Sequence, residues 1–160
     1  KYGYDIHDSV IRLTLIKCGN YPNPDADKCR HEFTYSLFPH SGDFREAGTV
    51  KFAYLLNSPL EAKKIESQNG TLSEEYSLLS IDSENVICET VKNAEDGDGV
   101  IVRLYECCNS RANVNLTLGF DFEDVYLTDL LENEERKLRK HGRTVNLTLK
   151  PFEIVTLKLK

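Results

Sequence analysis

Hydrophobic and polar residues alternate with a period of two along most of this chain, which predicts a mainly β-structure. The first part has two such stretches, residues 11–16 and 31–37. The second part has seven, at residues 76–81, 85–92, 100–107, 113–119, 124–131, 144–149 and 152–159. Short strands at close spacing, without long amphipathic helices between them, are typical of an antiparallel β-sandwich and not of a parallel sheet.

One segment departs from this alternation and predicts a short helix. Over residues 45–57 the apolar residues recur at spacings of three and four, and Pro59 ends the segment. These apolar residues are Ala47, Val50, Ala53, Tyr54 and Leu56. Gly48 weakens the helical pattern, so a strand remains the alternative for this segment.

Two charged segments are predicted to be loops. Residues 132–140 have helical propensity, but they lie between strands and favour a long solvated hairpin loop. The sequence Asp96-Gly-Asp-Gly99 has part of the pattern of a calcium loop. It lacks the spaced acidic ligands and the terminal glutamate of such a loop, and it favours a tight hairpin turn.

The pattern divides the chain into two parts. Residues 61–75 are polar and poor in large apolar side chains, as in an exposed linker. The part before the linker has only two strands and one helix, and two strands cannot bury their apolar face alone. We therefore expect an all-β protein, in which residues 1–70 are the C-terminal part of a large β-sandwich domain and residues 71–160 form a small closed antiparallel sandwich.

Composition narrows the function classes. The net charge of −6 over 160 residues argues against nucleic-acid binding, and no apolar run approaches the roughly 20 residues that span a bilayer. The chain contains no methionine, so we expect it to be a piece of a longer protein. Three glycosylation triplets occur, at Asn69, Asn115 and Asn146. Such triplets are common by chance, and the cysteines favour a cytoplasmic location instead.

The five cysteines do not form a secreted disulfide framework, because their number is odd and Cys107 and Cys108 are adjacent. Cys88 and Cys107 lie in strand patterns, where a free cysteine behaves as a small buried hydrophobe. Cys18 and Cys29 lie near His31, but no C-x-x-C pair frames a zinc site there.

The turn at residues 38–44 carries unusual chemistry for a loop, because it combines two phenylalanines with His40 and Asp43. In one interpretation His40 and Asp43 form a hydrogen-bonded pair that braces an active-site loop or contacts a distal sugar. In the other, His40 fixes its own turn and Asp43 caps the following helix, with Glu46 completing a capping box. The second interpretation is favoured, with Phe38 and Phe44 as packing residues.

Eight short motifs occur in the order of one enzyme family, and together they span nearly the whole chain. They are Lys1-Tyr-Gly-Tyr-Asp5, Val10-Ile-Arg-Leu-Thr-Leu15, His31-Glu-Phe-Thr-Tyr35, Pro39-His-Ser-Gly-Asp43, Glu89-Thr-Val-Lys92, Val102-Arg-Leu-Tyr-Glu106, Asp129-Leu-Leu131 and Pro151-Phe-Glu-Ile154. The chain thus resembles the C-terminal part of a glycoside hydrolase family 38 α-mannosidase, of the cytosolic or vacuolar and bacterial branch.

The resemblance implies that the chemistry lies elsewhere in the intact enzyme. In that family an N-terminal α/β domain holds zinc and an aspartate nucleophile. The enzymes hydrolyse terminal α-mannosides with retention of configuration at the anomeric carbon. We therefore expect no catalytic residue, metal ligand or cofactor in this chain, which alone would be inactive. Its expected partners are its own N-terminal catalytic domain and the α-mannoside substrate, and homo-oligomerisation stays open.

The resemblance also names candidate substrate-binding residues. In related mannosidases a β-domain loop just before a strand reaches toward the zinc site, and residues 1–5 correspond to that loop. Lys1, Tyr2 and Asp5 are therefore candidates to bind a mannose hydroxyl, together with His40. The alternative is an ordinary entry into a strand, with Gly3 in a tight turn. An alternative for the whole chain is a carbohydrate-binding or assembly module, although the absence of tryptophan argues against sugar binding.

Overall fold

The computed structural model describes residues 3–67, 69–71 and 73–160. The chain divides into two compact units, Lys1–Leu37 and Phe38–Lys160. The first unit contains a β-hairpin, and the second contains one helix and a β-sandwich. This division falls at a different place from the expected domain boundary near residue 70, which stays a prediction about the longer protein.

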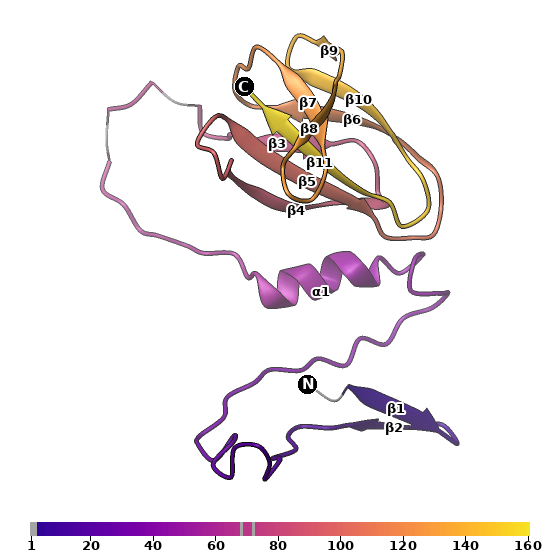
Figure 1. Cartoon of the computed structure of the whole chain (residues 1–160). Helices are drawn as coiled ribbons and strands as arrows, with labels where there is room; N and C mark the ends of the chain where they lie inside the picture. The colour runs from indigo at the N-terminus through magenta and orange to yellow at the C-terminus, as the bar shows by residue number, and fades with distance from the viewer. Residues whose placement is uncertain (1–2, 68, 72) are drawn as a thin grey trace. The chain divides into compact units, whose positions relative to one another are not determined.

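The hairpin of the first unit joins β1 (Tyr4–His7) to β2 (Val10–Leu13) in antiparallel register, with Tyr4 opposite Leu13 (Figure 1). The turn residues Asp8 and Ser9 have φ angles of 49° and 61°, as the tight primed turns of two-residue hairpins require. The strand predicted over residues 11–16 is confirmed in its first half, since β2 begins one residue earlier and ends at Leu13.

The strand predicted over residues 31–37 is wrong, because this segment forms no strand in the structure. Its Tyr35 and Leu37 are 66% and 77% exposed. A strand satisfies its backbone groups only by pairing with a neighbour, and the structure assigns this segment none. An alternating sequence without a partner strand therefore stays extended and unpaired.

The predicted helix is confirmed as α1 (Thr49–Asn57), although it starts four residues later than the apolar spacing indicates. Gly48 is the reason, since its φ of 64° lies in the left-handed region and separates the helix from the preceding turn. The helix ends at Asn57, two residues before Pro59. None of its residues is buried.

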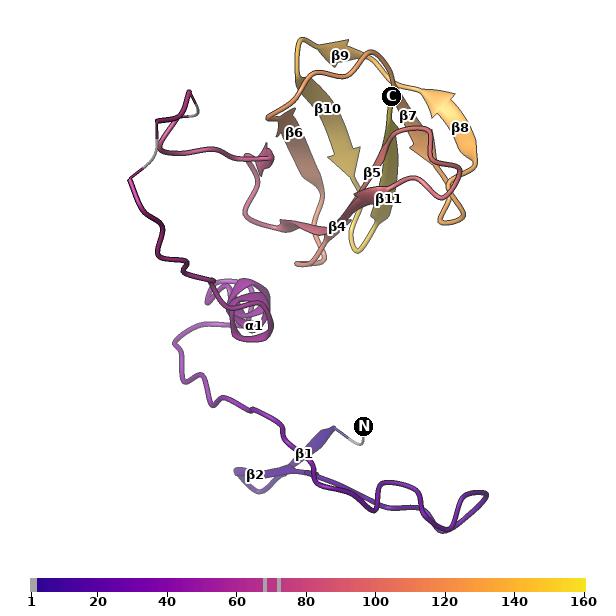
Figure 2. The ribbon, with the colours of Figure 1, turned by 90° about the vertical axis from the view of Figure 1, so that its left-hand side faces the viewer.

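The sandwich consists of two antiparallel sheets, as the sequence predicts (Figures 1 and 2). The four-stranded sheet has the order β3 (Leu79–Ile81), β6 (Ala112–Leu118), β10 (Thr144–Leu149) and β9 (Lys140–His141). The five-stranded sheet has the order β4 (Val86–Asn93), β5 (Val100–Glu106), β11 (Ile154–Leu159), β7 (Val125–Thr128) and β8 (Glu134–Lys137).

One hydrophobic core lies between these sheets and explains why the alternation is so regular in this half. Leu116 of β6 and Val145 of β10 are fully buried on one side, and Leu104 and Leu157 are fully buried on the other. Val155, Leu157 and Leu159, the alternate residues of β11, all belong to the core. Burial of such side chains is the main stabilising term of a sandwich.

The two predicted loops behave differently. Asp96-Gly-Asp-Gly99 is the hairpin turn between β4 and β5, as predicted, with Asn93 opposite Val100. Only glycine fits the last position, because a Cβ there would lie 2.2 Å from the Leu159 carbonyl oxygen. The loop predicted over residues 132–140 is wrong in its middle, since Glu134–Lys137 is β8 and pairs with β7. Its four residues are exposed, as suits a charged edge strand.

Candidate functional site

Two of the four predicted substrate-binding residues, Lys1 and Tyr2, lie outside the described residues. Asp5 lies on β1 opposite Arg12, and a guanidinium nitrogen of Arg12 is 3.3 Å from its carboxylate. Both side chains are 62% exposed. A role of Asp5 in substrate binding stays a prediction, and in this unit the residue forms an exposed cross-strand ion pair.

His40 lies in the turn that precedes α1, and its Nδ1 is 3.2 Å from the Ser41 carbonyl oxygen. Its ring is 5.5 Å from that of Phe38, which in turn lies 4.7 Å from that of Phe52 in the helix. These contacts agree with the interpretation in which the histidine fixes its own turn. A contact of His40 with substrate stays a prediction.

Asp43 closes the same turn. The backbone N–H groups of Arg45 and Glu46 donate to its Oδ1 at 2.9 and 3.1 Å, and the Asp43 N–H donates to Glu46 at 3.4 Å. The Arg45 side chain also binds the carboxylate, and with these backbone bonds it lowers the Asp43 pKa to about 2. The reciprocal contacts of a capping box are therefore present, but the predicted role of Asp43 as the cap of the helix is wrong, because Gly48 is the N-cap of α1 and the Asp43 contacts close the turn before it.

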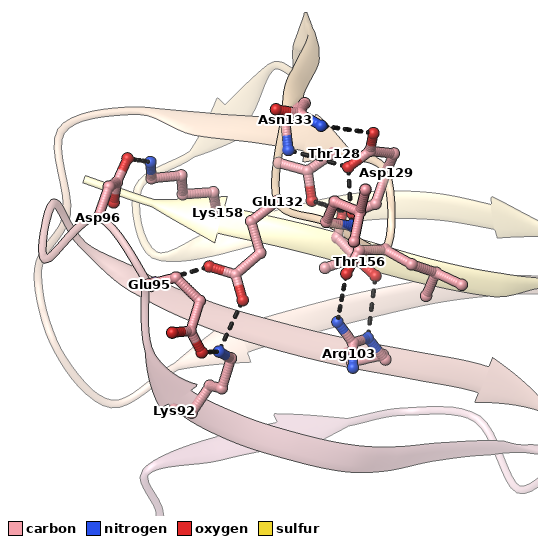
Figure 3. A network of polar contacts seen from close by, with 12 residues as sticks. Lys92, Glu95, Asp96, Arg103, Thr128, Asp129, Glu132, Asn133, Thr156 and Lys158 are labelled. Atoms are coloured by element: carbon pink, nitrogen blue, oxygen red, sulfur yellow. Dashed lines mark hydrogen bonds and ion pairs between the residues drawn. The ribbon is translucent and has the colours of Figure 1, made fainter.

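The face of the five-stranded sheet that points away from the core contains an arrangement that the sequence did not reveal. Thr156 and Lys158 alternate with the core residues of β11, yet each is only 2% exposed. The Lys158 ammonium lies 2.5 Å from Asp96 (Figure 3). It also lies 3.7 Å from Glu134. A buried ammonium requires such partners because its desolvation is costly. The hydrogen bond from Lys158 lowers the pKa of Asp96.

A loop over residues 129–133, between β7 and β8, closes over this outer face (Figure 3). The Asp129 Oδ1 accepts the N–H groups of Leu131 and Asn133, both at 2.9 Å. The Glu132 side chain, only 8% exposed, reaches across the sheet to Lys92 at 2.7 Å and accepts the Glu95 N–H at 2.8 Å. The loop is thus fixed at both of its acidic residues.

Electrostatics support this anchoring. The Asn133 side chain and the N–H groups around it lower the pKa of Asp129, and Lys92 lowers that of Glu132. Glu132 has a φ of 68°, which is uncommon for a residue other than glycine. Such a backbone persists where the surrounding contacts determine it, and here the bonds to Lys92 and Glu95 supply them.

A cleft of about 560 Å³ lies between this loop and β11. Its apolar part includes Leu130, Leu131 and Ile154, which are 60%, 82% and 55% exposed. Glu135 and Glu153 also line it. Several apolar side chains that are exposed together on a folded domain are typical of a surface that contacts another protein surface.

Glu106 is a second residue that sequence reasoning missed, although it is fully buried at the end of β5. Its carboxylate accepts hydrogen bonds from Asn85 Nδ2 and from the N–H groups of Cys108 and Phe152, at 2.8–2.9 Å. Burial raises the pKa of Glu106, but these hydrogen bonds outweigh it and leave the pKa below its ordinary value. Glu106 thereby ties three loops together at one end of the sandwich.

Nothing in the part of the chain that the structure describes forms a metal centre, since no group of three or more His, Cys, Asp or Glu is placed to hold an ion. Cys29 Sγ and His31 Nε2 lie 3.7 Å apart, and the same nitrogen is 2.7 Å from the Asp27 carbonyl oxygen. Over the described residues, no helix is long and apolar enough to cross a membrane.

Comparisons with known proteins identify the family. The sequence model described as "Glycosyl hydrolases family 38 C-terminal beta sandwich domain" matches residues 85–157. The chain is 37% identical to human "Alpha-mannosidase 2C1" and 30% identical to "Alpha-mannosidase G" of Dictyostelium discoideum. It is 27% identical to "Alpha-mannosidase" of Saccharomyces cerevisiae.

Each of these matches includes 99% of this chain. The chain spans only 15–16% of the length of these relatives. The matched residues 85–157 contain β4, β5, β7 and β8 of the five-stranded sheet in full and β11 as far as Leu157. The chain therefore belongs to glycosyl hydrolase family 38, and its sandwich is the C-terminal β-sandwich domain of that family.

Proposed function

We propose that this chain is the C-terminal β-region of a retaining α-mannosidase, in which it supports the catalytic domain and lines the edge of its pocket. The observation that carries the proposal is the exposed apolar surface of the first unit. Ile6, Ile11 and Leu15 are 63%, 59% and 52% exposed there. Side chains of this kind are buried in a complete domain, so residues 1–70 are the C-terminal part of a large sandwich whose other strands belong to the rest of the enzyme.

The catalytic groups belong to the N-terminal part of that enzyme in this proposal. A zinc ion and an aspartate nucleophile there carry out the retaining hydrolysis. The enzyme acts in the cytoplasm on terminal α-mannosides, and the substrate-binding candidates of this chain are Lys1, Tyr2, Asp5 and His40. This chain alone is inactive.

The test compares the 160-residue chain with the longer protein that carries it. With Zn²⁺ present, the chain alone hydrolyses no aryl α-mannoside, whereas the longer protein does. Replacing Ile11 and Leu15 by serine in the longer protein lowers the amount of folded, active enzyme, because these side chains are then buried against the other strands. The proposal fails if the isolated chain cleaves the substrate, or if the longer protein has no α-mannosidase activity.

A carbohydrate-binding module is the alternative, and it requires aromatic side chains exposed on one face. In the sandwich Phe122 is buried and Phe120 packs against the core. Tyr76 is 67% exposed, but its hydroxyl donates to the Gly119 carbonyl oxygen at 3.1 Å. Titration with α-mannosides followed by calorimetry decides between the two functions, because saturable binding to the isolated chain would favour the module.

A further inference from the structure

We propose that the loop over residues 129–133 is a preformed docking element, whose Leu130 and Leu131, together with Ile154, pack against the remainder of the same polypeptide. The inference rests on the proposed function, because it takes this chain to be part of a longer mannosidase. It assigns a role to the motif Asp129-Leu-Leu131, whose two leucines are not buried in the core of the sandwich.

The first argument is the contrast between the anchors of the loop and what the loop presents. Asp129 and Glu132 hold the backbone through bonds to Asn133, Lys92 and the Glu95 N–H. The Arg103 guanidinium adds a bond of 3.4 Å to the Leu130 carbonyl oxygen. The two leucines between these anchors nevertheless point into solvent and are 60% and 82% exposed.

Rigid presentation matters for binding. A loop that is already ordered loses little conformational entropy when its apolar side chains become buried, so more of the burial energy appears as affinity. Two leucines on a loop without these anchors would instead fold inward or sample many conformations. The anchored loop therefore has the properties of a binding element and not of a surface connection.

The second argument identifies the partner. Three aliphatic side chains offer far less than the roughly 800 Å² per partner that a stable interface between separate proteins buries. A second copy of the chain would thus not be held by this patch alone. Tethering within one polypeptide makes the binding intramolecular and raises the effective concentration of the partner, so a patch of this size can dock there. The relatives provide such a partner, because this chain spans only 16% of the human enzyme.

Hydrogen exchange measured by mass spectrometry tests the docking directly. We expect the amides of residues 129–133 and 153–156 to exchange about 10-fold more slowly in the longer protein than in the 160-residue chain. The hairpin turn around Gly142, between β9 and β10, is the internal reference and exchanges equally in both. Equal exchange of residues 129–133 in both proteins would overturn the proposal.

A double variant, Leu130→Ser with Leu131→Ser, separates docking from folding. In the isolated chain it leaves the unfolding midpoint unchanged, since both side chains are exposed. In the longer protein it restores the fast exchange of residues 129–133. Leu78→Ser is the matched control, because Leu78 is 48% exposed and does not line the cleft beside the loop, and it leaves that exchange slow.

The remaining outcomes keep this inference apart from the proposed function. If the isolated chain sediments as a dimer and the double variant sediments as a monomer, a second copy occupies the patch and the inference is wrong. If the longer protein shows the slow exchange but cleaves no α-mannoside, the docking stands and the proposed function fails. If it is active and the loop exchanges as in the isolated chain, only the docking is wrong.

Discussion

Strands β2 and β6 have nearly the same sequence pattern but opposite surroundings. In β6, Val114, Leu116 and Leu118 are at most 2% exposed, because a second sheet covers them. In and after β2, Ile11, Leu13 and Leu15 are between 46% and 59% exposed. Alternation thus predicts which side chains share a face, whereas burial depends on what lies opposite that face.

The proposed function explains this contrast by a sandwich that is complete in this chain and a first unit whose partner strands belong to the longer protein. In the sandwich, polar groups that become buried find partners inside the same domain, as Glu106 and Lys158 do. In the first unit, apolar groups remain in water although their pattern is that of a core strand. For this reason the same substitution should have very different effects in the two regions.

The largest difference is expected for truncating a leucine. Leu116→Ala removes a fully buried side chain and should destabilise the sandwich by about 3 kcal/mol, since large-to-small changes in a core lose burial and leave a cavity. Leu13→Ala in the isolated chain should change its stability by less than about 0.5 kcal/mol. Urea unfolding followed by circular dichroism measures both, and equal effects would contradict the division into a finished and an unfinished region.

A buried carboxylate should give the next largest effect. The Cys108 N–H donates to Oε1 of Glu106 and the Phe152 N–H to Oε2. In Glu106→Gln the amide nitrogen replaces one of these oxygens, so at least one donor loses its acceptor. We expect a loss of about 2 kcal/mol in the free energy of unfolding, in the range measured for hydrogen bonds to charged groups. Glu123→Gln is the control, because Glu123 is exposed. A neutral effect of the first change would mean that Glu106 does not hold the loops together.

These cases show how far the sequence leads. The strand pattern, the turn at residues 96–99 and the helix follow from local rules, and all three are present. The strand at 31–37 fails because pairing is not a local property. The positions of Lys158 and Glu106 could not be predicted, since their partners Asp96 and Phe152 lie 62 and 46 residues away. The only local indication of these buried contacts is that Lys158 and Glu106 each lie in a strongly apolar strand.

The free energy of unfolding of the sandwich should decrease gradually as the pH falls below about 5. The folded-state pKa values of Glu106, Glu132, Asp129 and Asp96 all lie below their ordinary values of 4.5 and 3.8. The unfolded chain therefore binds protons more readily, so this contribution to stability is present above about pH 5 and is lost as the pH falls through the folded values. Urea midpoints at pH 7, 5 and 3 measure the effect. Glu106→Gln should flatten this dependence, and a midpoint that rises toward pH 3 would contradict the sign.

The reactivity of the cysteine thiols should also differ between the two regions. Cys18 and Cys29 are exposed in the first unit, whereas Cys107 is buried in the sandwich. Burial, and then the neighbouring Cys108, raise the pKa of Cys107 from 9.0 to about 11. At pH 8 this higher pKa lowers the thiolate fraction of Cys107 by about 100-fold relative to a thiol with the ordinary pKa. The thiolate is the reactive form, so Cys107 should react slowly. A disulfide reagent should therefore label Cys18 and Cys29 first and Cys107 last.

The proposed function predicts that the order changes in the longer protein, because other strands would then cover the first unit. Slow labelling of Cys18 and Cys29 there, with Cys107 unchanged, would place the missing partner of the first unit in the rest of the enzyme. Slow labelling already in the isolated chain would show instead that the first unit buries its own surface. The same reagent thus measures how complete each region is by itself.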